Sequence, residues 1–215
     1  ARKGDPAGLT FVLFCIGRAW ALQTRVMNAV LSSVFESAPL VLASRASSLA
    51  LVQARLVQSE LAPVASEILP LTTKGDRVLD RSLADAGGKG LFIKELERAM
   101  LAGECDAAIH SMKDMETHFA DGTCIASVLP REDRRDAILG GFDRLDALPQ
   151  GAVVGTASVR RRALLLHHRP DLQIKLLRGN VNRRIAALDA GEYDAIILAV
   201  AGLKRLGITA PYSPI

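Results

Sequence analysis

The stretch KELERAMLAGECDAAIH at residues 94–110 returns in outline as RRIAALDAGEYDAIIL at residues 183–198. In each copy an amphipathic helical pattern ends at a glycine, and the chain then enters a strand as Glu-x-Asp-Ala-x-Ile. Gly103 and Gly191 follow the helix end, where a left-handed backbone favours glycine. The repeat predicts two similar units, although a capped helix followed by a strand is also a common local pattern.

Outward from this repeat, short β-branched runs alternate with helical patterns from Pro39 onward. Runs such as LVLASR, EILPLTT, CIASVLP and YDAIILAV have the length and composition of strands. The alternation predicts an α/β fold with largely parallel sheets. We expect a first lobe at 39–130 and a second at 131–207, with the junction near the charged stretch REDRRD.

The first 38 residues do not follow this pattern, and we set them aside from the fold. They join a short apolar run, LTFVLFCI, to scattered arginines. We expect Met27 to be the natural start and residues 1–38 to be an extension of uncertain origin. An arginine-rich transit peptide is the alternative, although no small-residue cleavage site follows a clean apolar core.

Composition narrows the function classes. There are 27 Lys and Arg residues against 23 Asp and Glu, and aromatic residues make up 4% of the chain. Proteins that bind single-stranded nucleic acid need aromatic stacking platforms, so we expect no nucleic-acid partner. No apolar run approaches the roughly 18 residues of a membrane span, so we expect no membrane partner. Cys15, Cys105 and Cys124 are widely spaced, which predicts a reducing compartment and no metal site.

Arginines stand where three strands run into helices. LVLASRASS, VVGTASVRRR and LLRGNVNRR each pass through a turn of Ser, Thr, Gly or Asn, with arginine near the helix start. The N-terminus of a helix is already positive, so a cation there costs roughly 0.3–1 kcal/mol. A bound carboxylate or phosphate would reverse this cost. We expect most of these arginines to bind anions; the alternative is that they are solvated surface residues.

Two further stretches could carry chemistry. TTKGDRVLDRSLADAGGKG at 72–90 is long, charged and rich in glycine, which is typical of either an active-site lid or a surface loop. Its GGKG lacks the Walker frame, which argues against ATP chemistry. HSMKD at 110–114 ends a strand with Ser111, Lys113 and Asp114. Asp114 is either a turn cap or a carboxylate that stabilises a cation and passes a proton to a departing amine.

Five motifs in this order resemble the hydroxymethylbilane synthase family, also called the porphobilinogen deaminase family. They are GGKGLFIKELE at 87–97, HSMKD at 110–114, VGTASVRRR at 154–162, LRGNVNRR at 177–184 and DAIILAVAGLKRLG at 194–207. The resemblance covers about residues 39–210. It implies two lobes of the periplasmic-binding-protein type around a cleft, and a third α+β domain whose cysteine carries a dipyrromethane cofactor.

Members of this family condense four porphobilinogen molecules head to tail, with release of ammonia, to give hydroxymethylbilane in haem and tetrapyrrole biosynthesis. Each pyrrole carries acetate and propionate groups that arginines can hold, and loss of ammonia leaves a cation. The resemblance implies that Asp114 is catalytic. It also implies that substrate and cofactor are bound by Arg45, Ser47, Lys89, Ser111, Lys113, Thr156, Ser158, Arg160, Arg161, Arg178, Gly179, Asn180, Arg184 and Arg205.

Several positions depart from the family pattern. Met115, Glu116 and Thr117 stand where the family has an apolar residue and proline, and Glu116 could raise the pKa of Asp114 or repel substrate carboxylates. Lysine is common at Asp85 and proline at Ser48. None of the three cysteines has the context of the cofactor-bearing one.

The third domain has no counterpart in these residues. We interpret 208–215 as a truncated segment returning toward the first lobe, and we expect the chain to be a fragment of a longer, monomeric, cytoplasmic transferase. Porphobilinogen and polypyrrole intermediates would be its partners, and its activity without the third domain is open. A plastid or another organelle is the alternative location. The alternative function is a non-catalytic two-lobed module that binds anions or solutes.

Overall fold

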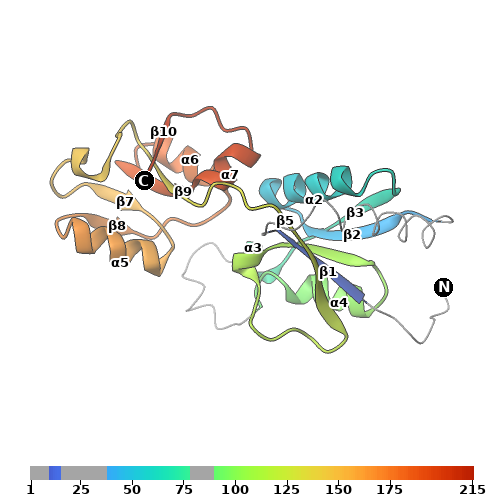
Figure 1. The fold of residues 1–215 in the computed structure, drawn as a ribbon. Helices are drawn as coiled ribbons and strands as arrows, with labels where there is room; N and C mark the ends of the chain where they lie inside the picture. The colour runs from blue at the N-terminus through green and yellow to red at the C-terminus, as the bar shows by residue number, and fades with distance from the viewer. Residues whose placement is uncertain (1–9, 16–37, 78–89) are drawn as a thin grey trace. The chain divides into compact units, whose positions relative to one another are not determined.

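The computed structural model describes residues 10–15, 38–77 and 90–215 (Figure 1). The chain divides into two compact units, here called unit 1 and unit 2. Among the described residues, unit 1 ends at Arg131 and unit 2 begins at Glu132, inside the charged stretch REDRRD. Each unit contains one open sheet with helices, so the prediction of an α/β fold is confirmed.

Unit 1 is built on a five-stranded sheet in which all neighbouring strands are parallel. Its strands are β1 (Thr10–Cys15), β2 (Leu40–Arg45), β3 (Ser66–Leu71), β4 (Ala107–Ser111) and β5 (Thr123–Leu129). Their order across the sheet is β3-β2-β4-β1-β5. Parallel sheets are covered on both faces, which explains the nearly continuous burial along β2 and β4.

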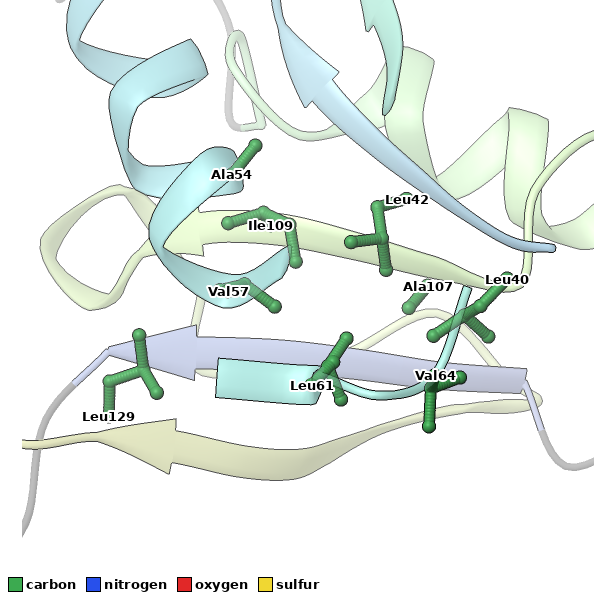
Figure 2. Close-up of a cluster of buried hydrophobic side chains, with 9 residues drawn as sticks. All are labelled: Leu40, Leu42, Ala54, Val57, Leu61, Val64, Ala107, Ile109 and Leu129. Atoms are coloured by element: carbon green, nitrogen blue, oxygen red, sulfur yellow. The ribbon is translucent and has the colours of Figure 1, made fainter. Parts of the chain in front are cut away.

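Two hydrophobic clusters hold helices α2 (Ser48–Leu61) and α4 (Lys94–Leu101) on the sheet of unit 1. The unit also contains the short helix α3 (Lys74–Arg77) and the 3₁₀ turn η1 (Met112–Asp114). Val57 and Leu61 of α2 lie in one cluster with Leu42 of β2 (Figure 2). Leu96 of α4 lies in the other cluster with Ala43. Successive strand residues point to opposite faces, so Leu42 and Ala43 serve different clusters.

Strand β1 comes from the segment that the sequence pattern led us to set aside. It pairs in parallel with β4 on one side and β5 on the other, with Cys15 opposite Ser111. Among the described strands, β5 joins the sheet only through β1. The structure thus places residues 10–15 in the sheet, although we had set them aside; a short apolar run rich in aromatic and β-branched residues is typical of a strand.

Unit 2 has a mixed sheet of order β10-β6-β9-β7-β8. Its strands are β6 (Asp136–Leu139), β7 (Val153–Gly155), β8 (Gln173–Lys175), β9 (Ala195–Ala199) and β10 (Tyr212–Pro214). β7 is parallel to β8 and β9, but β6 is antiparallel to β9 and β10, so the expectation of largely parallel sheets holds fully only for unit 1. Within residues 208–215, the structure places β10 at the edge of this sheet.

The helices of unit 2 also pack on two hydrophobic clusters. They are α5 (Val159–His168), α6 (Val181–Asp189) and α7 (Val200–Arg205), and a 3₁₀ turn η2 spans Leu145–Ala147. Leu165 of α5 lies in a cluster with Val154 and Ile197. Leu203 of α7 lies in the second cluster with Ile196. The strands β6, β7 and β9 are accordingly mostly buried, whereas the edge strands β8 and β10 are not.

The repeated stretch has the same local structure in both units. The glycine after each helix has a positive φ, 72° in unit 1 and 75° in unit 2, as the helix end requires. The aspartate of each copy then accepts a hydrogen bond from a neighbouring strand. Asp106 Oδ2 lies 2.8 Å from the Val41 nitrogen, and Asp194 Oδ2 lies 2.7 Å from the Val153 nitrogen. Matching contacts favour two similar units over a chance local pattern.

Candidate active site

In unit 1, strand β4 delivers three of the predicted site residues to its carboxyl end. Ser111 is its last residue, and the 3₁₀ turn η1 that follows contains Lys113 and Asp114. Lys113 is exposed, whereas the side chain of Asp114 is only 22% exposed. The N-cap position of this turn is Ser111, which makes no side-chain cap bond, and Asp114 is the last residue of the turn.

Arg45 reaches the same place from the end of β2, the strand beside β4. Its Nη1 lies 3.6 Å from Asp114 Oδ2. The ring of Phe92 covers its guanidinium group, with the carbon Cζ 4.1 Å from the ring centroid. A guanidinium group is attracted to the face of an aromatic ring, so Phe92 fixes the plane of Arg45.

A second carboxylate, Asp76, holds the other edge of Arg45. Arg45 Nε donates to Asp76 Oδ2 at 3.2 Å, and Nη2 forms an ion pair with Oδ1. Thr73 Oγ1 also donates to Asp76 Oδ2, at 2.7 Å. Burial alone would raise the pKa of Asp76, but the hydrogen bonds from Arg45 and Thr73 lower it below its usual value. Asp76, Arg45 and Asp114 form what we call the carboxylate–arginine cluster.

The pKa of Asp114 is raised, chiefly by burial, which disfavours the charged carboxylate. Lys113 and Arg45 oppose this rise, and the negative charge of Asp76 adds to it. Glu116, which could raise the pKa of Asp114 or repel substrate carboxylates, is not among the charges that shift the pKa of Asp114. It lies near Gly90, and its negative charge adds to the effect of burial in raising the pKa of Glu97. The like charge that acts on Asp114 is therefore that of Asp76.

Ser111 is held by a residue that the sequence reasoning missed. The side-chain amide of Gln53, buried on α2, places Nε2 2.9 Å and Oε1 3.2 Å from the Ser111 hydroxyl oxygen. A signal was present, because Gln53 is the polar residue among the buried positions of α2. Ser47 occupies the N-cap position of α2 without a side-chain cap bond, and Lys89 lies outside the described residues.

His110 is a buried residue of β4. Burial lowers its pKa to about 4, because the charged imidazolium is disfavoured there, and the positive charge of Arg45 adds to the effect. The imidazole is therefore neutral at neutral pH. Its place within β4 agrees with the expectation that His110 is a strand residue.

In unit 2, Arg161 at the start of α5 is bound by protein groups on all sides. Its Nε and Nη2 donate to Asp136 at 2.9 Å and 2.6 Å, and its Nη1 donates to the Ile197 carbonyl at 3.1 Å. The Arg161 side chain is 13% exposed. The anion that compensates this cation is therefore a carboxylate of the chain itself.

Arg184 lacks such a carboxylate within hydrogen-bonding distance among the described residues, and its Nε donates to the Gly179 carbonyl at 2.8 Å. Burial, together with the positive charges of Arg161 and Arg178, lowers its pKa to about 10. We call these three residues the arginine cluster. Arg184 is thus a buried cation beside two other cations, and its surroundings favour an acidic group of a ligand.

Several other predicted ligands of unit 2 support local turns. Ser158 Oγ accepts from the Arg161 nitrogen at 3.3 Å, Thr156 Oγ1 accepts from the Ser158 nitrogen at 3.2 Å, and Asn180 caps α6. Gly179 has φ of 105°, which a residue with a side chain rarely adopts. Two predicted arginines remain: Arg160 is exposed on α5, and Arg205 is half-buried on α7.

Unit 2 also has a pocket of about 360 Å³ beside α6. Arg178, Arg183, Glu192 and Tyr193 line it, so it shares one member with the arginine cluster. Within the described residues, no group of three or more His, Cys, Asp or Glu side chains is placed to bind a metal. No helix in that part of the chain is long and apolar enough to cross a membrane.

Residues 40–214 match a family described as porphobilinogen deaminase, dipyrromethane cofactor binding domain. The chain belongs to the porphobilinogen deaminase family. A porphobilinogen deaminase of Phenylobacterium zucineum (strain HLK1) is 51% identical over 179 residues, which is 77% of this chain and 56% of that protein. The chain thus spans little more than half the length of this curated relative, and the family resemblance seen in the five motifs is confirmed.

Solved structures give weaker similarities. An ancestral cationic amino acid solute-binding protein aligns with a TM-score of 0.46 and 15% identity, over 86% of this chain and 83% of that one. The VFT2 domain of Bordetella pertussis BvgS, as a double mutant, aligns with a TM-score of 0.43 and 14% identity, over 87% and 75%. The family assignment does not depend on these similarities.

Proposed function

We propose that this chain is the porphobilinogen-binding and catalytic part of a transferase that condenses four porphobilinogen molecules into hydroxymethylbilane. The observation that carries the proposal is the raised pKa of Asp114, a carboxyl group that lies 3.6 Å from Arg45. Family membership and the positive charge of Arg184, buried beside two other arginines, support it.

The reaction needs one group that first gives a proton and then, as the resulting anion, lies beside a cation. The aminomethyl C–N bond of porphobilinogen breaks, ammonia leaves with the electron pair, and the pyrrole methylene becomes cationic. The free carbon of a second pyrrole then forms the C–C bond and loses its proton. A carboxyl group with a raised pKa holds its proton to a higher pH and can pass it to the departing amine. Once ionised, Asp114 stabilises the cation.

The arginines have the complementary task of holding acidic side chains. Arg184 has charge to offer in unit 2, while Asp136 already occupies Arg161, and the family motifs place Arg178 in the same binding set. A dipyrromethane group, when bound, supplies the first pyrroles to which new units are joined, and its acetate and propionate groups fit the charge of the arginine cluster. We propose that Ser47, Lys89, Ser111, Lys113, Thr156, Ser158, Arg160, Gly179, Asn180 and Arg205 complete the binding set, as the family motifs imply.

Attachment of the cofactor through Cys105 is disfavoured by its surroundings. Cys105 is buried, and burial raises the pKa of its thiol to about 11, with Asp106 and Glu104 adding to the rise. Such a thiol is a poor nucleophile at neutral pH. We propose that the attachment cysteine lies in sequence that the curated relative has and this chain does not span, and that the protein is a monomer.

The test compares binding with turnover in the purified chain. Porphobilinogen is added, its affinity is measured by calorimetry, and its consumption is followed with released ammonia. We expect the wild type to bind porphobilinogen, and Asp114→Asn to bind it with little change while any consumption stops. Asp121→Asn, an exposed aspartate of the same unit, is the matched control.

Each outcome decides between the two functions. Consumption that depends on Asp114 supports the transferase. Binding without consumption, in both this chain and a version extended to the length of its relatives, supports the non-catalytic anion-binding module. That module is favoured by one observation, because the arginine cluster can hold an anion without any catalytic group. Undiminished consumption in Asp114→Asn refutes the catalytic role.

A further inference from the structure

The geometry of Arg45 suggests a role for a residue outside the predicted site. Asp76 is reached by two nitrogens of the guanidinium group, Nε at 3.2 Å and Nη2 in an ion pair, while Asp114 is approached by Nη1 alone at 3.6 Å. Two parallel N–H···O contacts are stronger and more directional than one longer contact. Arg45 is therefore held chiefly by Asp76.

Asp76 is itself fixed by its neighbours. Thr73 donates to it twice, through Oγ1 at 2.7 Å and through its backbone nitrogen at 3.3 Å. Thr73 is fully buried, so this support cannot easily swing away. Asp76 binds one edge of the Arg45 guanidinium group and Phe92 covers its face, so the position and the plane of this group are fixed before any ligand binds.

One guanidinium group carries one positive charge, and in this cluster two carboxylates share it. The groups whose charges act on Asp114 are Lys113 of its own turn, Arg45 of β2 and Asp76 of α3. The first two attract a negative charge and the third repels it. If Asp76 were neutral, the positive charge of Arg45 would act on Asp114 alone and would stabilise its ionised form more strongly.

We propose that Asp76 is a positioning residue, which holds Arg45 beside Asp114 and neutralises part of its charge, so that Asp114 can keep a proton to give away. It acts through Arg45 and touches no reacting atom. The catalytic value of this arrangement rests on the proposed function, because the proton on Asp114 matters only if Asp114 gives it to the departing amine. The hold of Asp76 on Arg45 does not depend on a ligand.

The test follows the carboxyl carbon of Asp114 by NMR through a pH titration of the full chain labelled with ¹³C-aspartate. In Asp76→Asn we expect the pKa of Asp114 to fall, because a like charge has gone and Arg45 is free to pair with it. Asp76→Glu restores the charge and should bring the titration back toward that of the wild type. Asp121→Asn is the control for loss of an exposed carboxylate that is not among the charges acting on Asp114, and it should leave the titration unchanged. An unchanged or raised pKa of Asp114 in Asp76→Asn would overturn the proposal.

The wild-type chain gives a second readout that does not depend on a variant folding. The Nε–H of Arg45, bound to Asp76, should exchange with solvent about tenfold or more slowly than the Nε–H of the exposed Arg98. Equal exchange rates would refute the hold on Arg45. Both measurements are made without ligand, so a chain that fails to bind porphobilinogen would refute the proposed function and leave this assignment to be judged on its own result.

Discussion

Substituting Gly75 by alanine tests whether the plane of Arg45 depends on close packing. Gly75 is buried in α3, and a Cβ built on it would lie 2.3 Å from Cε1 and 2.6 Å from Cδ1 of Phe92. Ordinary contact between carbons begins near 3.5 Å, so the ring must move by about 1 Å. The same ring covers the guanidinium group of Arg45, and a displaced ring loosens that contact.

The expected cost follows from two opposing terms. Overpacking a close contact costs about 1–3 kcal/mol. Alanine regains up to about 1 kcal/mol over glycine in a helix, and the short α3 collects only part of that. A net loss of about 1–2 kcal/mol in the free energy of unfolding of unit 1 is therefore expected. At a typical urea slope the midpoint falls by roughly 0.5–1 M.

A double-mutant cycle with Phe92→Ala identifies the cause. Urea denaturation followed by far-UV circular dichroism gives the free energy of unfolding for wild type, G75A, F92A and the double variant. Without the ring, the added methyl group has room, so G75A should cost little in the F92A background. An equal cost in both backgrounds would refute the packing argument, because residues that do not interact give additive effects.

Three further predictions concern charge. Arg184→Gln should raise the melting temperature by roughly 2–4 °C, because a base whose pKa falls to about 10 on folding destabilises the fold at neutral pH. The same variant should weaken porphobilinogen binding about tenfold or more. A lower melting temperature would contradict the first expectation. Glu116→Gln should stabilise the chain at pH 7 but not at about pH 3. The pKa of Glu97 is raised in the fold, so ionised Glu97 destabilises the fold only once the pH has risen through the pKa of Glu97 in the unfolded chain. Thermal scans at both pH values measure this loss of stability. In a full-length version, Asp114→Asn should stop ammonia release while calorimetry still finds porphobilinogen bound, and equal loss of both would instead indicate a binding role.

The sequence predicted the fold where local patterns repeat. The helix, glycine and Glu-x-Asp-Ala strand recur in both units with the same hydrogen bond from a neighbouring strand, and a single sequence already contains that pattern. It also marked arginine at the starts of α5 and α6, where the arginine cluster lies. Patterns of this kind span few residues, so they can be recognised without knowing the tertiary structure.

Partners far apart in sequence were not predictable in this way. The pattern showed that Arg45 and Arg161 need a negative charge, but not that Asp76 and Asp136 provide it. These pairs depend on which strands become neighbours. Gln53 was missed for a related reason, because its hydroxyl partner lies on another element.

The place of β1 also bears on how this protein can be produced. Residues 10–15 lie outside the region matched by the family, yet they join β5 to the rest of the sheet in unit 1. A version that begins at Met27 would leave the facing edges of β4 and β5 without the partner that they have among the described strands. Unpaired strand edges recruit strands from other molecules, so the shortened protein should aggregate in a concentration-dependent manner. The choice of first residue therefore decides whether the strand that carries Ser111 has a protected edge.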